Sequence, residues 1–155
     1  MTTSEHRQQR LGSLLVFLQF SLILVLVWLA LPGLMAGNRP TGALLFAVIG
    51  LALGIWALSV NKVGNFNIHP SPKVGGDMVC EGPYRWIRHP MYTSVLACGA
   101  ACACLAESPW GWLALSALAV VLFVKSIFEE RWMLAARPAY ASYRTRTWRF
   151  VPGVF

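Results

Sequence analysis

Two apolar runs joined by a short polar turn decide how this chain folds. Residues 91–128 read MYTSVLACGAACACLAESPWGWLALSALAVVLFVKSIF, and the charged residues among them are Glu107 and Lys125. Glu107-Ser108-Pro109 is typical of a tight connection. Apolar segments of about 20 residues are typical of helices that cross a membrane. The stretch therefore predicts an antiparallel hairpin of two membrane helices, at about 91–106 and 110–128, of which the first is short for a span.

Two further apolar runs precede this hairpin, at about 14–34 and 41–60. Hydrophobic residues make up 57% of the 155 residues and charged residues only 12%, which is unlike a soluble domain. The first run is longer than the roughly 7–15 residues of a signal-peptide core, so we expect it to be a retained span. The sequence thus predicts one all-α integral membrane domain over residues 1–155 with about four transmembrane helices, a loop at 61–90 and a tail at 129–155.

The distribution of basic residues predicts the orientation in the membrane. Most of them lie before the first span, between the second and third, or at and after the end of the fourth, and only Arg39 lies on the other side. Cytoplasmic loops are enriched in Lys and Arg, so both termini, the loop and the tail are predicted to be cytoplasmic, as in a protein of a bacterial inner membrane. The same rule accounts for the net charge of +7 without a nucleic-acid partner. The basic residues concerned are Arg7, Arg10, Lys62, Lys73, Arg85, Arg88, Lys125, Arg131, Arg137, Arg144, Arg146 and Arg149.

Small side chains concentrate in the third predicted span, over residues 97–104. Small residues let helix backbones approach closely in lipid, so this helix is predicted to be central. The cysteines of the span, with Cys80 in the loop, form no CxxC pair and have no nearby His, so neither a disulfide framework nor a metal site is predicted.

The first charged motif is Arg88-His89-Pro90, which immediately precedes the third span. Pro suits the first turn of a helix, so Arg88 and His89 are placed at a helix N-terminus. Free N–H groups and the helix dipole favour anions there, and the two side chains add to this preference. The motif predicts a site for a carboxylate or a phosphate. Arg85, a few residues earlier, is interpreted as a membrane-surface anchor.

The second charged motif is Glu129-Glu130, at the end of the fourth span. Lys125 stands four residues before Glu129, so a local ion pair between the two is the simplest interpretation of that acid. Measured from Ser108 in the turn, His89 lies 19 residues before and Glu130 lies 22 residues after. Because a helix rises 1.5 Å per residue, both arms return to about the same membrane depth. The basic and acidic motifs are therefore predicted to face one another across the hairpin.

A site with anionic and cationic groups beside lipid suits a zwitterionic ligand, and S-adenosylmethionine is one such ligand. Its carboxylate could meet Arg88 or His89, and its ammonium group or ribose hydroxyls could meet Glu129 or Glu130. Its sulfonium could lie near an aromatic face such as Tyr92 or Trp132. This charge pattern permits the ligand but does not single it out.

The residues of both motifs resemble a known family. The stretch Gly82–Tyr92, which ends in Arg-His-Pro-Met-Tyr, is similar to the membrane methyltransferases related to isoprenylcysteine carboxyl methyltransferase and phospholipid N-methyltransferase. Glu129-Glu130 resembles the acidic pair of this family. The resemblance covers about residues 61–155. It also includes Gly64-Asn65-Phe66, Pro70-Ser71-Pro72, Tyr140, Tyr143 and Val151-Pro152. The chain departs from the usual pattern at Ser94, where many members have Gly, and at Arg137-Pro138, where many have Phe-Gly.

The resemblance implies methyl transfer from S-adenosylmethionine to a lipophilic acceptor reached from the bilayer, at a site formed by the loop and the tail. By position in the motifs, the implied cofactor-binding residues are Arg88, His89, Tyr92, Glu129 and Glu130. No catalytic base is assigned. The acceptor remains open among a carboxylate, a thiol and an amine, and so does the oligomeric state. Two alternatives also remain: a related membrane reductase that uses a nicotinamide cofactor, and a non-catalytic membrane subunit.

Overall fold

The computed structural model of the chain describes residues 3–61 and 78–154. The loop motifs Gly64-Asn65-Phe66 and Pro70-Ser71-Pro72 lie outside the described residues. The described chain is almost entirely helical, and its one β-type feature is an isolated parallel bridge between Ile87 and Trp148. In order, the helices are α1 (Thr3–Met35), α2 (Thr41–Val60), the short 3-10 helix η1 (Gly82–Arg85), α3 (Pro90–Ala106), α4 (Pro109–Ala136) and α5 (Ala139–Arg144).

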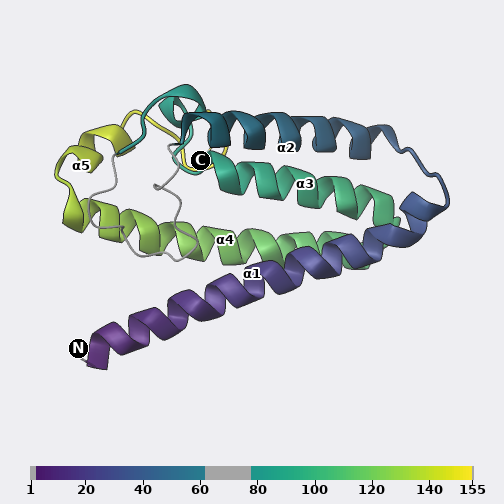
Figure 1. The fold of residues 1–155 in the computed structure, drawn as a ribbon, viewed down its shortest axis with the longest axis horizontal. Coiled ribbons are helices and arrows are strands. Elements are labelled where there is room, and N and C mark those ends of the chain that lie inside the picture. Colours follow the sequence, from purple (N-terminus) through teal and green to yellow (C-terminus); the bar gives the residue numbers. More distant parts are fainter. Residues whose placement is uncertain (1–2, 62–77, 155) are drawn as a thin grey trace.

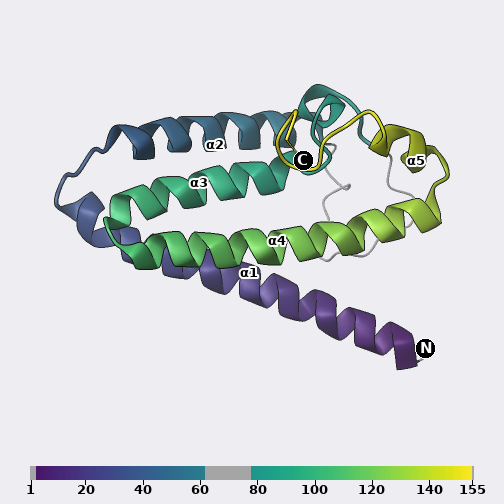
Figure 2. The ribbon, with the colours of Figure 1, turned by 180° about the vertical axis from the view of Figure 1, so that it is seen from behind.

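Four long helices lie side by side, as two hairpins that turn at the same end of the bundle (Figures 1 and 2). The start of α1, η1 and α5 all lie at the opposite end. Three helical segments are long and apolar enough to cross a membrane: Gln9–Met35, Thr41–Val60 and Pro109–Ala136. Helix α3 is also apolar but has only 17 residues, a rise of about 26 Å. The prediction of an all-α membrane protein is confirmed, and α3 is the short member of the bundle as expected.

Helix α4 ends later than the sequence predicted. The apolar run stops near residue 128, yet the helix continues to Ala136 and includes both Glu129 and Glu130. It ends at Arg137, whose backbone is extended with φ −146° and ψ 106°, immediately before Pro138. A residue that precedes Pro is disfavoured in the helical region, so Pro138 explains the stop. The acidic pair is therefore held on a rigid helix.

Helix α3 is central, as its small residues predicted, and contacts α1, α2 and α4. A Cβ atom built on Gly50 of α2 would lie 2.9 Å from the backbone nitrogen of Cys98, so the two backbones touch there. A Cβ on Gly111 of α4 would lie 3.1 Å from the Cα of Ala103 on the other side of α3. Close backbone approach of this kind stabilises helix pairs in lipid, where burial of apolar surface does not distinguish a neighbouring helix from a lipid tail.

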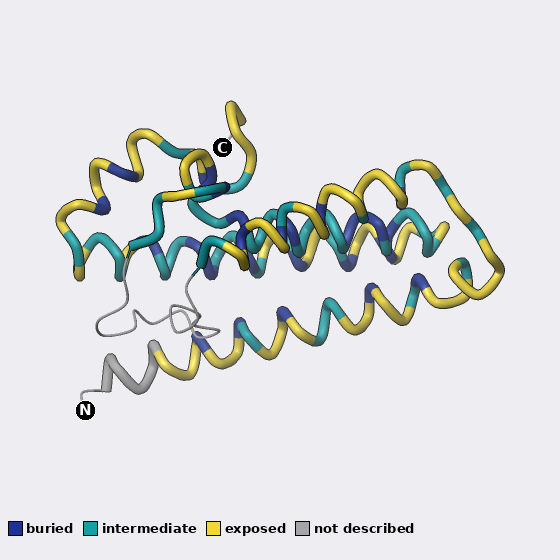
Figure 3. Tube along the Cα trace, turned by 45° about the horizontal axis from the view of Figure 1, so that its top comes forward, coloured by how far each residue is buried: buried dark blue, intermediate teal, exposed yellow. Residues whose placement is uncertain are grey.

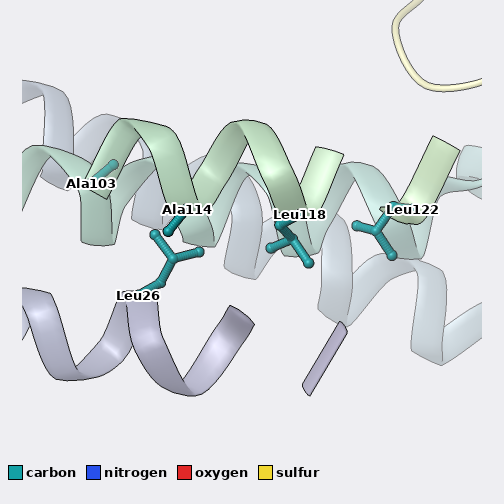
Figure 4. Packing of buried hydrophobic residues seen from close by; sticks show 5 residues of the cluster. All are labelled: Leu26, Ala103, Ala114, Leu118 and Leu122. Carbon is teal, nitrogen blue, oxygen red and sulfur yellow. The ribbon is translucent and has the colours of Figure 1, made fainter. Parts of the chain in front are cut away.

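The buried apolar cluster is small and lies between α1, α3 and α4. It consists of Leu26, Ala103, Ala114, Leu118 and Leu122 (Figure 4). Elsewhere α1 and α2 expose most of their large apolar side chains, and buried positions recur along only one side of each (Figure 3). This pattern is that of a bundle whose outer surface faces lipid instead of water.

The turn between α3 and α4, at the end of the bundle away from η1 and α5, has the local structure that its residues favour. The side chain of Ser108 caps α4 by accepting a hydrogen bond from the N–H of Trp110 at 3.3 Å. Glu107 takes a left-handed backbone conformation with φ 46°, which ends α3. Its carboxylate accepts a hydrogen bond from Asn38 at 3.0 Å, so the two turns of the bundle are joined.

The contact between α2 and α3 can be tested with two glycines of α2. Gly50→Ala should lower the melting temperature in detergent, because its Cβ would meet Cys98 at 2.6 Å and 2.9 Å. Overpacking of this kind costs about 1–3 kcal/mol, which outweighs the roughly 1 kcal/mol that Ala gains over Gly in a helix. Gly42→Ala is the matched control, since its nearest neighbour would be the Sγ of Cys104 at 3.4 Å. Equal melting temperatures for the two variants would contradict this packing.

Candidate functional site

The Arg-His-Pro motif is held in place by a segment from the other end of the sequence. The chain leaves η1 at Trp86, whose carbonyl accepts a hydrogen bond from the N–H of Trp148 at 2.9 Å. The N–H groups of Arg88 and His89 donate in turn to the carbonyls of Trp148 and Arg149, at 2.8 Å and 3.1 Å. These three bonds, around the bridge from Ile87 to Trp148, align the two segments side by side. The motif is thereby fixed at the start of α3.

Glu130 is the hub of this arrangement. Its side chain is only 3% exposed, and its Oε1 accepts hydrogen bonds from Nε of Arg88 at 2.8 Å and Nε of Arg149 at 3.0 Å. Its Oε2 accepts from Nη2 of Arg149 at 2.9 Å, so Arg149 binds the carboxylate with two parallel bonds. The half-exposed guanidinium of Arg144 lies 3.5 Å from the same oxygen. One carboxylate thus joins α4 to the segment before α3 and to the tail.

Arg88 is almost entirely engaged by the chain itself. In addition to Glu130, its guanidinium donates to the carbonyl of Thr147 and, at 3.1 Å, to the carbonyl of Arg144. Its side chain is 9% exposed. These contacts explain a buried arginine without a ligand, since carbonyls and a carboxylate satisfy its donors. A cofactor contact of Arg88 stays a prediction.

Glu129 forms the more open half of the site. Its side chain is 22% exposed, seven times as much as that of Glu130. Its Oε1 accepts a short hydrogen bond of 2.5 Å from the hydroxyl of Tyr92, and its Oε2 lies 3.5 Å from Nδ1 of His89. The rings of His89 and Tyr92 stack with 5.3 Å between centroids, and Phe150 lies against both at 6.0 and 6.5 Å. A carboxylate and three aromatic rings therefore share one corner.

His89 lies between the two acids and caps the start of α3. Its Nε2 is 3.3 Å from Oε1 of Glu130, while Nδ1 faces Glu129. Burial disfavours the charged imidazole, but hydrogen bonds and charge from Glu129 and Glu130 outweigh that effect and raise the pKa of His89 above its ordinary value. Its carbonyl accepts from the N–H groups of Tyr92 and Thr93. The N–H of Tyr92, which could have bound an anion at this helix start, is therefore already bonded, and so is the N–H of His89.

Lys125 does not form the predicted pair with Glu129. Its ammonium group donates to Oε1 of Gln19 on α1 at 2.9 Å and lies 5.2 Å from the centre of the Tyr92 ring. Among the described residues, no carboxylate lies within ion-pair distance of it. The i,i+4 spacing permitted the pair, but the side chain turns inward to the bundle, where Gln19 and the Tyr92 ring replace the acid.

The structure brings together all five residues that the motifs singled out: Arg88, His89, Tyr92, Glu129 and Glu130. It adds Arg149, Arg144, Phe150 and Gln19, which the sequence did not mark. The two arginines were interpreted only as cytoplasmic positive charge. Trp132, suggested as an aromatic partner, makes none of the ring contacts that join His89, Tyr92 and Phe150.

Two tyrosines of α5 hold this helix against η1, next to the Arg-His-Pro motif. The hydroxyl of Tyr143 donates to the carbonyl of Tyr84 in η1 at 2.6 Å, and its ring packs on Tyr140 with 5.6 Å between centroids. Burial raises the pKa of the Tyr143 hydroxyl, so it remains a proton donor in this bond. Arg85 is exposed, in keeping with an anchor at the surface.

The central role of Glu130 leads to a stability prediction. Glu130→Gln should leave two buried guanidinium groups beside a neutral amide, and removal of one partner of a buried pair typically costs about 3–5 kcal/mol. The melting temperature in detergent at neutral pH should fall clearly. Glu107→Gln is the control at the opposite end of the bundle, where the hydrogen bond to Asn38 is exposed and the effect should stay within about 0.5 kcal/mol. Equal effects of the two changes would rule out Glu130 as the hub.

The raised pKa of His89 gives a pH dependence with a defined sign. The folded protein favours the protonated ring, so this contribution to stability is fully present below the unfolded-state pKa of about 6.5. It is lost as the pH rises through the higher pKa of the folded state. The melting temperature should therefore decline as the pH rises above about 6.5, and His89→Gln should flatten that decline. The same slope in the variant would show that another group titrates.

Comparison with known proteins identifies a family and a curated relative. The model of the phospholipid methyltransferase family matches residues 39–137, which include α2, η1, α3 and α4 and both charged motifs. The curated protein named "Cobalt-zinc-cadmium resistance protein CzcN", from Cupriavidus metallidurans, is 29% identical over 136 residues. The match covers 83% of this chain and 61% of that relative, so the chain spans less than two thirds of its length. Since the family model matches well over half of the chain, this protein belongs to the phospholipid methyltransferase family.

Proposed function

We propose that this protein transfers a methyl group from S-adenosylmethionine to an acceptor with an apolar body that lies in the membrane. The observation that carries the proposal is the corner formed by Glu129, His89, Tyr92 and Phe150. A partly exposed carboxylate there meets aromatic faces at the end of an apolar bundle. Membership of the phospholipid methyltransferase family supports the same chemistry.

The donor set of this corner fits the cofactor. Glu129 offers a carboxylate to an ammonium group or to ribose hydroxyls, and it is the exposed acid of the pair. The ring faces of His89 and Tyr92 offer a surface on which a sulfonium is attracted. Arg144, 47% exposed at the edge of the cluster, offers a guanidinium to a carboxylate. Each charged part of the cofactor thus has a complementary group within one cluster.

When bound, S-adenosylmethionine supplies an activated methyl group on a positively charged sulfur. The chain mainly aligns the reactants and excludes water. Glu130, Arg88 and Arg149 lock the segments that carry His89 and Tyr92, so the aromatic corner is rigid before any ligand arrives. An acceptor that is already ionised does not have to be deprotonated, so this step needs no general base.

The same end of the bundle is proposed to face the cytoplasm. The start of α1, η1 and the tail all lie at this end (Figure 1), and η1 and the tail carry Arg85, Arg144, Arg146 and Arg149, which bias orientation. The cofactor is water-soluble and would enter there, while the acceptor would arrive along the lipid-facing sides of the helices.

One observation favours a second candidate, a membrane subunit without catalysis. Glu130 is fully paired within the chain by Arg88, Arg149 and His89, so this half of the cluster is stable without a ligand. The printed name of the curated relative refers to metal resistance and does not state a reaction. The open half of the cluster, at Glu129, distinguishes the two candidates.

Calorimetry with the purified protein in detergent tests the proposal. S-adenosylmethionine and its demethylated product should both bind, and Glu129→Gln should weaken both by about tenfold or more, since a charge-assisted hydrogen bond contributes about 1.5–3 kcal/mol. Glu107→Gln, which changes an acid in the distant turn, should leave binding unaltered.

The outcomes separate the candidates. No binding of either ligand at millimolar concentration, or equal binding by Glu129→Gln, would sink the methyltransferase proposal. Binding of a reduced nicotinamide instead would point to a membrane reductase. Binding of neither class would leave the non-catalytic subunit.

A further inference from the structure

A buried lysine lies just below the proposed cofactor corner. Lys125 is 2% exposed and belongs to the part of α4 that the apolar run places inside the membrane. Its Nζ donates one hydrogen bond of 2.9 Å, to the neutral amide of Gln19, and lies over the Tyr92 ring at 5.2 Å. An ammonium group has three donors. In the part of the chain that the structure describes, this ammonium contacts one neutral acceptor and one ring face, and the charge of Glu129 acts on it from beyond ion-pair distance.

This arrangement is unfavourable for a purely structural residue. A charge inside a membrane bundle is costly and usually pairs with an opposite charge. Arg88 and Arg149 both form ion pairs with Glu130, whereas no described carboxylate lies within ion-pair distance of Lys125. The helix also has apolar side chains on the same face, because Leu122 lies three residues earlier and is completely buried. The position is therefore prepared for an anion that arrives from outside the chain.

Lys125 is also connected to the cofactor corner. The ring that it faces is that of Tyr92, whose hydroxyl donates to Glu129. Glu129 stands one helical turn after Lys125 on α4, so the lysine is the membrane-side neighbour of the acid proposed to hold the cofactor. Tyr92 packs against the apolar cluster that contains Leu122. An apolar acceptor with an anionic head would thus place its body among leucines and its head beside the ammonium of Lys125.

We propose that Lys125, assisted by Gln19, selects an anionic methyl acceptor, a carboxylate or a thiolate on an apolar molecule. The inference rests on the proposed methyl transfer and names its substrate class. The acceptor's lone pair forms the new bond to the methyl carbon while the bond from that carbon to the sulfonium sulfur breaks. The sulfur retains the electron pair, and no proton is released because the acceptor is already ionised.

The same charge disfavours an amine as acceptor. A protonated amine would lie beside the ammonium of Lys125 and be repelled, and the two side chains that contact this ammonium, Gln19 and Tyr92, are not bases. A carboxylate or thiolate head would instead gain the missing counter-charge. It would exchange with the amide oxygen of Gln19, which ties α1 to α4 in the meantime.

Three probes with one chain and different heads test the inference at about pH 9, where a thiol is partly ionised: dodecanoate, 1-dodecanethiol and dodecylamine. In nanodiscs without cofactor, dodecanoate should raise the melting temperature of the protein and dodecylamine should not. With methyl-labelled S-adenosylmethionine, label should enter the acid or the thiol in preference to the amine. Lys125→Met should abolish the melting shift and raise the acceptor KM about tenfold or more, with the cofactor Kd unchanged. Lys125→Arg should restore part of the selectivity.

A double variant distinguishes a loss of selectivity from a loss of folding. Lys125→Met with Gln19→Leu removes both partners of the buried hydrogen bond, so its stability should match or exceed that of the natural protein. It should still fail to select the anion. Ser94→Ala, which breaks a buried bond of 2.7 Å to the carbonyl of Gly50, should leave selectivity among the probes unchanged.

Preferential methylation of the amine, or an acceptor KM that is the same in Lys125→Met, would overturn the inference. So would failure of both anionic probes in a protein that binds the cofactor. Failure to bind the cofactor at all would instead refute the proposed function, and the melting shifts would still report on Lys125.

Discussion

The structure depends on one buried carboxylate that holds together three segments far apart in the chain. Glu130 of α4 binds Arg88, which precedes α3, and Arg149 of the tail. Two guanidinium groups this close would repel each other without the acid between them. The backbone bridge between Ile87 and Trp148 then aligns the two segments that the arginines bring in. Everything else in the site, including the stacked rings of His89 and Tyr92, is positioned by this ion cluster.

The two ends of the bundle are held together by different forces. In lipid, close backbone contact between small residues replaces the hydrophobic drive, and Gly50 against Cys98 shows how close α2 and α3 come. At the end that carries the site, hydrogen bonds and ion pairs instead join η1 and the tail to the long helices. The apolar helices thus form a rigid scaffold, and the polar cluster lies at one end of it. Lys125 lies at the boundary between the apolar helices and the polar cluster.

Much of this architecture could be predicted from the sequence. Apolar runs gave the helices, and the lengths of the hairpin arms brought His89 level with Glu130 because helical rise is constant. The pairing of Lys125 with Glu129 was wrong because spacing along a helix does not say which side chain turns toward a neighbouring helix. The pairing of Arg149 with Glu130 could not be predicted. The enrichment of basic residues on the cytoplasmic side accounts for every arginine of the tail equally well, so it singles out none of them. The end of α4 was placed too early because hydropathy marks the membrane boundary, whereas Pro138 ends the helix.

The pairing of Arg88 and Glu130 with Arg149 has a consequence for how the protein is made. Ribosomes synthesise chains from the N-terminus, so α1 to α4 emerge before Arg149 does. Until then Glu130 lacks the partner that binds it with two hydrogen bonds, and the segment that contains Ile87 lacks its pairing with Trp148. The charged end of the nascent hairpin therefore stays hydrated until the tail has been synthesised. This end can therefore assemble only after Arg149 has been synthesised, when the backbone segments around Ile87 and Trp148 pair and Arg149 joins Arg88 on Glu130.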